Sequence, residues 1–197
     1  MSLDTKYRPK NYEDVLGQSG SIKTLKGIVS EGAGWKQSYL FAGPFGSGKT
    51  TLGRILARAL LCEDPINGEP CNKCSSCESM LSGESDAFVE VDAATNSGKD
   101  DVKKVLSEID YNAFSGRRKL YLFDESHQLS TSALDALLKP ILSRFCNIYI
   151  PLPCINGKKL CLHTYNQIDI SEEDFFKDRN RWFKKLMNSK NNYNSIN

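Results

Sequence analysis

Residues 43–50 read Gly-Pro-Phe-Gly-Ser-Gly-Lys-Thr, and this stretch decides the fold. It matches the pattern G-x-x-x-x-G-K-[ST] at every position. Glycines at these spacings let successive backbone N–H groups turn inward around phosphate oxygens. The helix expected to begin at Lys49 adds its positive N-terminal end. The pattern therefore predicts a phosphate-binding loop (P-loop), and the alternative is a glycine-rich turn without a ligand.

The side chains of this loop have expected roles. The ammonium of Lys49 would reach the β- and γ-phosphates of a nucleotide, and the hydroxyl of Thr50 would bind Mg²⁺. The other positions expected to bind the nucleotide are Gly43, Pro44, Gly46, Ser47, Gly48 and Thr51.

Strand and helix signals alternate along the chain around the loop. Short apolar runs predict strands at 38–41, 87–91 and 120–123, and apolar residues at helical spacing predict helices at 22–29, 49–61 and 102–109. This alternation is typical of the α/β class, in which helices flank a parallel sheet. Residues 146–152 could form one more strand, although Pro151 and Pro153 would confine it to an edge or to a strand end.

The strand predicted at 120–123 is followed by Asp124 and Glu125. Asp124 would hold Mg²⁺, directly or through water, and Glu125 would polarise an attacking water. Neighbouring side chains on an extended backbone project in opposite directions, so the two carboxylates can take different roles. The alternative is a strand that ends in acids because it reaches solvent. We expect the loop and this strand end to meet around one magnesium–triphosphate unit.

Four cysteines within sixteen residues follow the spacing C-x₈-C-x₂-C-x₂-C, and they are Cys62, Cys71, Cys74 and Cys77. Four thiolates can close a tetrahedral Zn²⁺ site with no open position for water, so the predicted zinc site is structural. The alternatives are free thiols or a redox pair of Cys74 and Cys77. We expect the whole segment 62–77 to be a loop. The other cysteines, Cys146, Cys154 and Cys161, lack this spacing and are expected to be isolated thiols.

Composition excludes several classes of protein. The chain has 197 residues, of which 40% are hydrophobic and 25% charged, so disorder throughout is excluded. No apolar run approaches the ~20 residues needed to span a bilayer, and the polar start of the chain does not resemble a signal peptide. A cytoplasmic location is therefore expected. The net charge of +2 does not by itself indicate a nucleic-acid partner.

Residues 1–140 resemble the γ/τ subunit family of bacterial DNA polymerase III, the AAA+ motor of the sliding-clamp loader. The stretches that carry the resemblance are Lys6 to Pro9, Val15 to Gln18, 43–50, the cysteine segment 62–77, Val91 to Asn96, Asp124 to Ser130 and Ala133 to Lys139. The resemblance implies an AAA+ P-loop NTPase fold that uses ATP, Mg²⁺ and Zn²⁺. It also implies ATP-driven loading of a clamp onto primer-template DNA, together with other loader subunits, in a DNA-directed DNA polymerase holoenzyme.

The resemblance also implies roles for residues outside the loop. Those expected beside the adenine are Tyr7, Arg8, Pro9, Val15 and Gly17. Arg144 looks like the family's arginine finger, which would complete the catalytic site of a neighbouring subunit.

The chain departs from the family pattern after residue 138, where Leu138-Lys139-Pro140 runs directly into Ile141-Leu142-Ser143-Arg144. A sensor strand in the middle of the sheet and a helical lid domain are therefore expected to be missing. Buried backbone groups left unpaired by such a gap would cost ~1–3 kcal/mol each. We expect residues 1–145 to form the nucleotide-binding domain and 146–197 a divergent tail, with the last ten residues disordered.

Three hypotheses about function remain open at this point. The chain is a clamp-loader ATPase subunit, a subunit that binds ATP and zinc without hydrolysis, or a truncated remnant that does not fold stably. The presence of Glu125 favours the enzyme, because a protein that only binds ATP does not need a residue that activates water. The expected loss of the sensor strand and lid favours the binding subunit.

Overall fold

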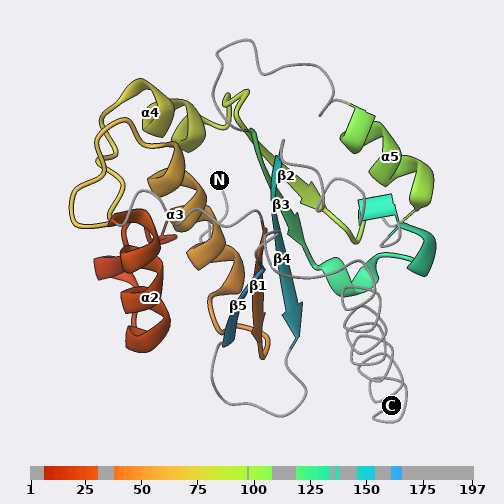
Figure 1. The fold of residues 1–197 in the computed structure, drawn as a ribbon, viewed down its shortest axis with the longest axis horizontal. Helices are drawn as coiled ribbons and strands as arrows, with labels where there is room; N and C mark the ends of the chain where they lie inside the picture. Colours follow the sequence, from red (N-terminus) through yellow and green to blue (C-terminus); the bar gives the residue numbers. More distant parts are fainter. Residues whose placement is uncertain are drawn as a thin grey trace.

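A five-stranded sheet lies at the centre of the molecule, with strand order β2-β3-β4-β1-β5 (Figure 1). The computed structural model describes residues 7–30, 38–96, 98–107, 119–133, 136–137, 146–153 and 161–165. The strands are β1 (Ser38–Gly43), β2 (Phe88–Asp92), β3 (Lys119–Asp124), β4 (Cys146–Pro153) and β5 (Cys161–Tyr165).

The first four strands run parallel, as the alternation of strands and helices predicted. The registers pair Phe88 with Leu120, Lys119 with Cys146, and Ser38 with Ile148. Strand β5, which the sequence did not predict, pairs antiparallel with β1. The sheet is therefore mixed, with an antiparallel strand added beside the strand that leads into the P-loop.

Strand β4 lies between β3 and β1, in the middle of the sheet. The sequence analysis expected a strand in the middle of the sheet to be missing, but residues 146–153 occupy that position, so β1 and β3 each have a partner there. Of the two alternatives that the prolines left, an edge strand or a position at a strand end, the second is confirmed. Pairing with β3 ends at Tyr149, before Pro151 and Pro153, whereas pairing with β1 continues to the end of β4. The prolines are tolerated because they lie at the end of the strand, beyond the last pair with β3.

Helices cover both faces of the sheet. Figure 1 shows α2 (Ser19–Ser30), α3 (Lys49–Leu61) and α4 (Ser75–Ser82) on one side and α5 (Lys99–Ser107) on the other. The structure also has two short 3₁₀ helices, η1 (Tyr12–Asp14) and η2 (Ser126–Gln128), and helical residues at 131–133 and 136–137.

The segment 62–77 is not a loop throughout, which corrects the expectation. Helix α4 begins at Ser75 and therefore includes Cys77. Cys74 precedes the helix with an extended backbone, and Gly83 ends it in the left-handed conformation at φ 81°. A glycine in that conformation is a common helix stop, because it has no Cβ to clash.

Helix α3 packs closely on the sheet through its apolar face. Leu52 and Leu56 of this helix are fully buried in one core with Phe41 and Leu122 from the sheet. A Cβ atom on Gly53 would lie 3.1 Å from Cδ1 of Leu122, so the glycine lets the helix approach β3. This packing fixes α3, and with it the loop that precedes the helix.

Some expectations fall on residues that the structure does not describe. These are the disordered end at 188–197, the rest of the expected tail after Tyr165 and the end of the helix predicted at 102–109, of which α5 covers the part up to Ser107. The beginning of the expected tail is described, and its residues 146–153 and 161–165 form two strands of the sheet. Each helix in the described ranges is too short or too polar to cross a membrane.

We expect Leu122→Ala to lower the free energy of unfolding by about 2–5 kcal/mol, because it leaves a cavity between β3 and α3. The matched control is Leu16→Ala, at a leucine that is 96% exposed, which should change stability by less than about 0.5 kcal/mol. Urea denaturation followed by circular dichroism measures both. Equal unfolding midpoints for the two variants would contradict the packing of α3 on β3.

Candidate nucleotide and metal sites

The P-loop connects the end of β1 at Gly43 to the start of α3 at Lys49. Gly46 and Gly48 have φ values of 72° and 86°. This left-handed conformation is costly for residues with a Cβ. Gly48 is also the N-cap of α3, and its carbonyl accepts from Leu52 N at 2.8 Å. The two glycines thus provide the sharp turn that brings the N-terminal end of α3 to the loop.

Lys49 folds its side chain back over the loop. Its Nζ donates to the carbonyl oxygens of Gly43 and Pro44, at 3.0 and 2.9 Å, and lies 5.5 Å from the centre of the Phe45 ring. Burial lowers the pKa of Lys49, and the negative charges of Glu125 and Asp124 oppose this shift. The ammonium group is therefore held by backbone carbonyls of the loop that a phosphate group could replace.

Thr50 and Asp124 meet across the site, although they are 74 residues apart in the chain. The hydroxyl of Thr50 lies 2.9 Å from Oδ1 and 3.0 Å from Oδ2 of the carboxylate. The backbone N–H of Glu125 donates to Oδ1 of Asp124 at 2.9 Å. A hydroxyl and a carboxylate oxygen at one point form the oxygen-rich environment that Mg²⁺ prefers.

Glu125 does not continue the strand. Strand β3 ends at Asp124, and Glu125 has φ 48° and ψ 35°. The expectation that two acids on one extended backbone project in opposite directions is therefore wrong for this pair. The left-handed conformation costs a non-glycine residue roughly 1–2 kcal/mol. The negative charge of the Glu125 carboxylate still acts on Lys49, because it opposes the lowering of the lysine pKa by burial.

The loop residues fit the phosphate groups of a nucleotide. Ser47 Oγ is buried and has no hydrogen-bond partner among the described residues. A buried hydroxyl without a partner costs free energy, and a phosphate oxygen at the loop would remove that cost by accepting its hydrogen. The donors around the site are consistent with this fit, because they combine a lysine ammonium, a hydroxyl and the N-terminal end of a helix.

The N-terminal segment expected beside the adenine is linked to the P-loop by one contact. Nε2 of Gln18 donates to the carbonyl oxygen of Ser47 at 3.4 Å. Gly17 precedes it with φ 79°, and Tyr7 is 71% exposed. Arg8 and Pro9 are half-buried, as is Val15, which caps the C-terminal end of η1. The candidate arginine finger, Arg144, lies outside the described residues.

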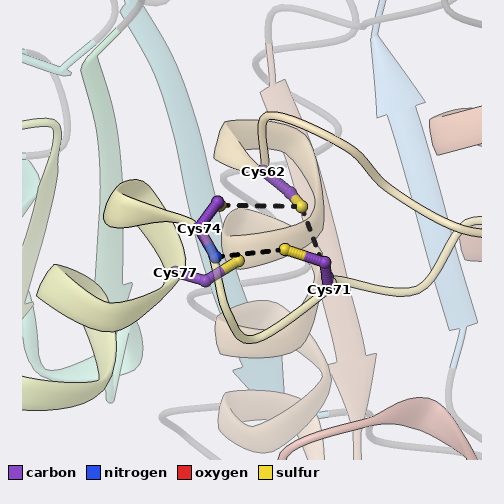
Figure 2. Close-up of side chains that lie close together, drawn as sticks. All are labelled: Cys62, Cys71, Cys74 and Cys77. Atoms are coloured by element: carbon purple, nitrogen blue, oxygen red, sulfur yellow. Dashed lines mark hydrogen bonds between the residues drawn. The ribbon is translucent and has the colours of Figure 1, made fainter.

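The four cysteine side chains converge on one point, as Figure 2 shows, and their sulfur atoms all lie within 4.8 Å of one another. Sγ of Cys74 lies 4.0 Å from Sγ of Cys62. Four sulfurs around a tetrahedral zinc, with Zn–S bonds of ~2.3 Å, stand about 3.8 Å apart. The cluster therefore fits a zinc ion with only a slight contraction, whereas a redox pair would need only two of these four thiols.

Backbone groups inside the cluster point at the sulfurs. The N–H groups of Lys73 and Cys74 lie 3.5 and 3.3 Å from Sγ of Cys71 and lower the pKa of that thiol to about 7. The N–H of Cys71 donates to Sγ of Cys62 at 3.3 Å. Burial raises the pKa of Cys62 and of Cys77 above the usual value. These N–H donors favour the thiolate forms of Cys71 and Cys62. A bound cation would offset the cost of burying thiolates at Cys62 and Cys77.

Comparison with known proteins adds independent information. A family model described as DNA polymerase III, delta subunit, matches residues 17–158. The chain is 37% identical over 135 residues to DNA polymerase III subunit tau of Bacillus subtilis, which covers 68% of this chain and 24% of that protein.

Two further relatives have similar names. The chain is 34% identical over 181 residues to DNA polymerase III subunit gamma of Buchnera aphidicola subsp. Schizaphis graminum, covering 88% of this chain and 49% of that protein. It is 37% identical over 139 residues to DNA polymerase III subunit tau of Escherichia coli, covering 71% and 22%. The chain therefore spans about a quarter to a half of the length of these relatives.

We expect the purified chain to contain one equivalent of zinc, and Cys71→Ser to lose it, because three thiolates cannot close the Cys₄ site. Metal analysis by mass spectrometry measures the content. Cys154→Ser, at a cysteine outside the cluster spacing, is the control and should retain the metal. Unchanged zinc in Cys71→Ser would contradict the assignment of this residue as a ligand.

We also expect zinc affinity to rise steeply between about pH 6 and 8. Burial raises the pKa of Cys62 and Cys77, so both are protonated in the metal-free chain over this range. Binding must release both protons, so the apparent affinity should rise at least about 100-fold per pH unit, and more steeply below about pH 7, where Cys71 is also protonated. Competition with a chromogenic chelator at several pH values measures the slope. A flat profile would mean that these two thiols are not ligands.

Proposed function

The chain belongs to the DNA polymerase III, delta subunit, family, and on this premise we propose that it is a clamp-loader-type ATPase subunit of a replicative DNA polymerase holoenzyme. It would bind and hydrolyse ATP to place a sliding clamp on primed DNA. The similarity to tau and gamma subunits supports this proposal. The chain spans about half or less of those relatives, so the activity and partners of a whole loader subunit are part of the proposal.

The observation that carries the proposal is the contact between Thr50 and Asp124. A P-loop that binds only phosphate needs the glycines, the lysine and the helix end. Hydrolysis also needs a metal ion beside the terminal phosphates, and a hydroxyl and a carboxylate within 3.0 Å of each other supply two ligands for it. Bound ATP and Mg²⁺ would supply the phosphoanhydride bond and its neutralising charge.

Three further groups around the loop would position and activate the reactants: the backbone N–H groups, Lys49 and Glu125. The N–H groups of the P-loop would bind the phosphate oxygens, and Lys49 would exchange its two carbonyl partners for them. Glu125 would accept a proton from the attacking water. Its backbone N–H is fixed on the carboxylate of Asp124, which supports a short and defined distance between the metal ligand and the base.

The partners in this proposal are other loader subunits, a sliding clamp and primer-template DNA. The cysteine cluster would bind zinc with a structural role, because four thiolates leave no coordination position for a reacting water. Arg144 would act on the ATP of a neighbouring subunit.

We expect the purified chain to hydrolyse ATP when partner subunits, clamp and primed DNA are present. Lys49→Ala should abolish turnover, since the ammonium that neutralises the β- and γ-phosphates is lost. Glu125→Gln should retain ATP binding and slow turnover by about 100-fold or more, because the amide cannot accept a proton. Release of inorganic phosphate measures turnover, and a fluorescent ATP analogue measures binding.

The matched control for these variants is Glu78→Gln, at an exposed acid on α4, which should leave turnover unchanged. ATP binding without turnover in the unsubstituted chain would identify a non-hydrolysing loader subunit instead. If the chain shows no cooperative thermal transition in the presence of ATP, Mg²⁺ and Zn²⁺, the third hypothesis holds, in which the chain is a truncated remnant that does not fold stably.

A further inference from the structure

A tight hairpin in the cysteine segment packs directly on helix α2. Ile66 and Glu69 pair through two backbone hydrogen bonds of 3.0 and 2.9 Å. Asn67 and Gly68 between them have φ 52° and 78°. A Cβ atom on Gly68 would lie 2.5 Å from the carbonyl oxygen of Lys26, so only glycine fits there. The cysteine segment is therefore not an independent appendage, because its hairpin lies against the backbone of the nucleotide-binding core.

Glu69, at the end of this hairpin, reaches the N-terminal segment of the chain. Its Oε2 accepts from the backbone N–H of Tyr12 at 2.9 Å. Its Oε1 lies 2.7 Å from Nζ of Lys26, and its side chain is only 14% exposed. One half-buried carboxylate thus connects three parts of the molecule, which are the cysteine segment, helix α2 and the start of η1.

Asn72 makes a second connection from within the cluster, since it lies between two of the cysteines. Its side-chain Nδ2 donates to Oδ1 of Asn11 at 2.6 Å. Its backbone N–H bonds to the sulfur of Cys77. Asn72 has φ 57°, a conformation that asparagine adopts more readily than most residues. The same residue therefore faces the sulfur cluster with its backbone and the N-terminal segment with its side chain.

Arg58 provides a third connection, from helix α3. This arginine is buried, with 6% of its surface exposed, and its Nη2 donates to the carbonyl oxygen of Lys10. Arg58 lies in the last turn of α3, four residues before Cys62, which caps the C-terminal end of this helix, so the two lie on the same side of the helix end. One Zn²⁺ and four thiolates carry a net charge of −2, and a buried cation close to them is favourable. Arg58 thus binds the N-terminal backbone at a place where the filled cluster attracts its charge.

We propose that the cysteine cluster, when it holds its metal, clamps residues Lys10–Asp14 on the nucleotide-binding core, so that metal binding and ATP binding strengthen each other. Glu69 and Asn72 are the positioning residues of this linkage. The ATP half rests on the proposed function, together with the place beside the adenine that the family resemblance implies for Tyr7, Arg8 and Pro9. These residues directly precede the clamped segment, and Gln18, which follows it, contacts the P-loop.

The linkage has a simple physical basis. Ligation fixes both ends of the short turn that contains Asn72, because Cys71 and Cys74 bind the same ion. Without the ion, this turn gains conformational freedom, and the hydrogen bond to Asn11 must order it unaided. Local opening of the turn then releases the N-terminal segment. A ligand that binds only the ordered segment must bind more weakly, and thermodynamic reciprocity requires ATP to strengthen metal binding by the same factor.

The first test does not involve ATP. Hydrogen exchange of the full chain, measured by mass spectrometry on peptides covering residues 7–18, compares the zinc-loaded protein with the protein after chelation by EDTA. We expect exchange in this segment to speed up at least about fivefold on zinc removal, while peptides from β3 stay protected. Unchanged exchange at residues 10–14 would overturn the proposal.

The second test measures the linkage with nucleotide. Affinity for a fluorescent ATP analogue is measured with and without zinc in the unsubstituted chain, in Glu69→Ala and in Asn72→Ala. We expect zinc removal to weaken binding about 5- to 20-fold in the unsubstituted chain. We also measure the double variant Glu69→Ala/Asn72→Ala. Its affinity for the ATP analogue should be low even with zinc bound and should change less than about twofold when zinc is removed. An equal response to zinc in all chains would overturn the proposal.

Two further variants separate positioning from folding. Glu69→Gln keeps an oxygen that can accept from Tyr12 N–H, so it should retain most of the zinc response. Glu63→Ala removes a carboxylate in the same segment that bonds to Ser75 and Ser76, and it should behave like the unsubstituted chain. Loss of the zinc response in Glu63→Ala but not in Glu69→Ala would contradict the assigned roles. If the chain bound no nucleotide at all, the proposed function would fail, and hydrogen exchange would still decide the clamping of residues 10–14.

Discussion

The hydrogen bond between Thr50 and Asp124 is the interaction on which the candidate site depends. It joins the first turn of α3, the helix that follows β1, to the end of β3. In the sheet, β4 separates β1 from β3. The carboxyl ends of parallel strands lie at the same edge of a sheet. The loop that follows β1 and the carboxylate of Asp124 at the end of β3 therefore lie at the same edge. The close packing at Gly53 then sets the distance between α3 and β3. A shift of the helix along the sheet would separate the oxygen atoms of Thr50 and Asp124, and the magnesium site that we propose there would be lost.

The parts of the molecule that the sequence predicted are those whose chemistry lies within a few residues. The P-loop needs glycines and a lysine at fixed spacing, and its strand and helix follow directly from apolar patterns. The cysteine cluster is also local, since Cys62 to Cys77 need only a short turn to meet. The middle strand was harder, because prolines argued against it and only the pairing limit at Tyr149 shows why they fit. Strand β5 had no clear signal, as an added antiparallel strand needs no special sequence.

The connections between the cysteine cluster and the core could not be predicted, although one signal was present. Asn67-Gly68 is a dipeptide typical of tight hairpins, and it indicates the turn. It does not indicate that the turn packs on Lys26, nor that Glu69 then reaches Tyr12. Such contacts join residues that are far apart in the chain, and no local spacing encodes them. The backbone conformation of Glu125 could not be predicted either, because the apolar pattern does not show that the strand ends at Asp124.

The central position of β4 has a consequence for how the chain folds during synthesis. The two strands that flank it emerge from the ribosome earlier, yet they cannot join through backbone hydrogen bonds until residues 146–153 arrive. The pairing of Ser38 with Ile148 joins residues that lie 110 positions apart, and such distant pairings are slow to form. Both neighbours of β1, which are β4 and β5, come later in the chain, so β1 exposes both of its edges during translation, and β3 exposes the edge that β4 later covers. Protection from aggregation at that stage depends on the helices that cover the faces of the sheet.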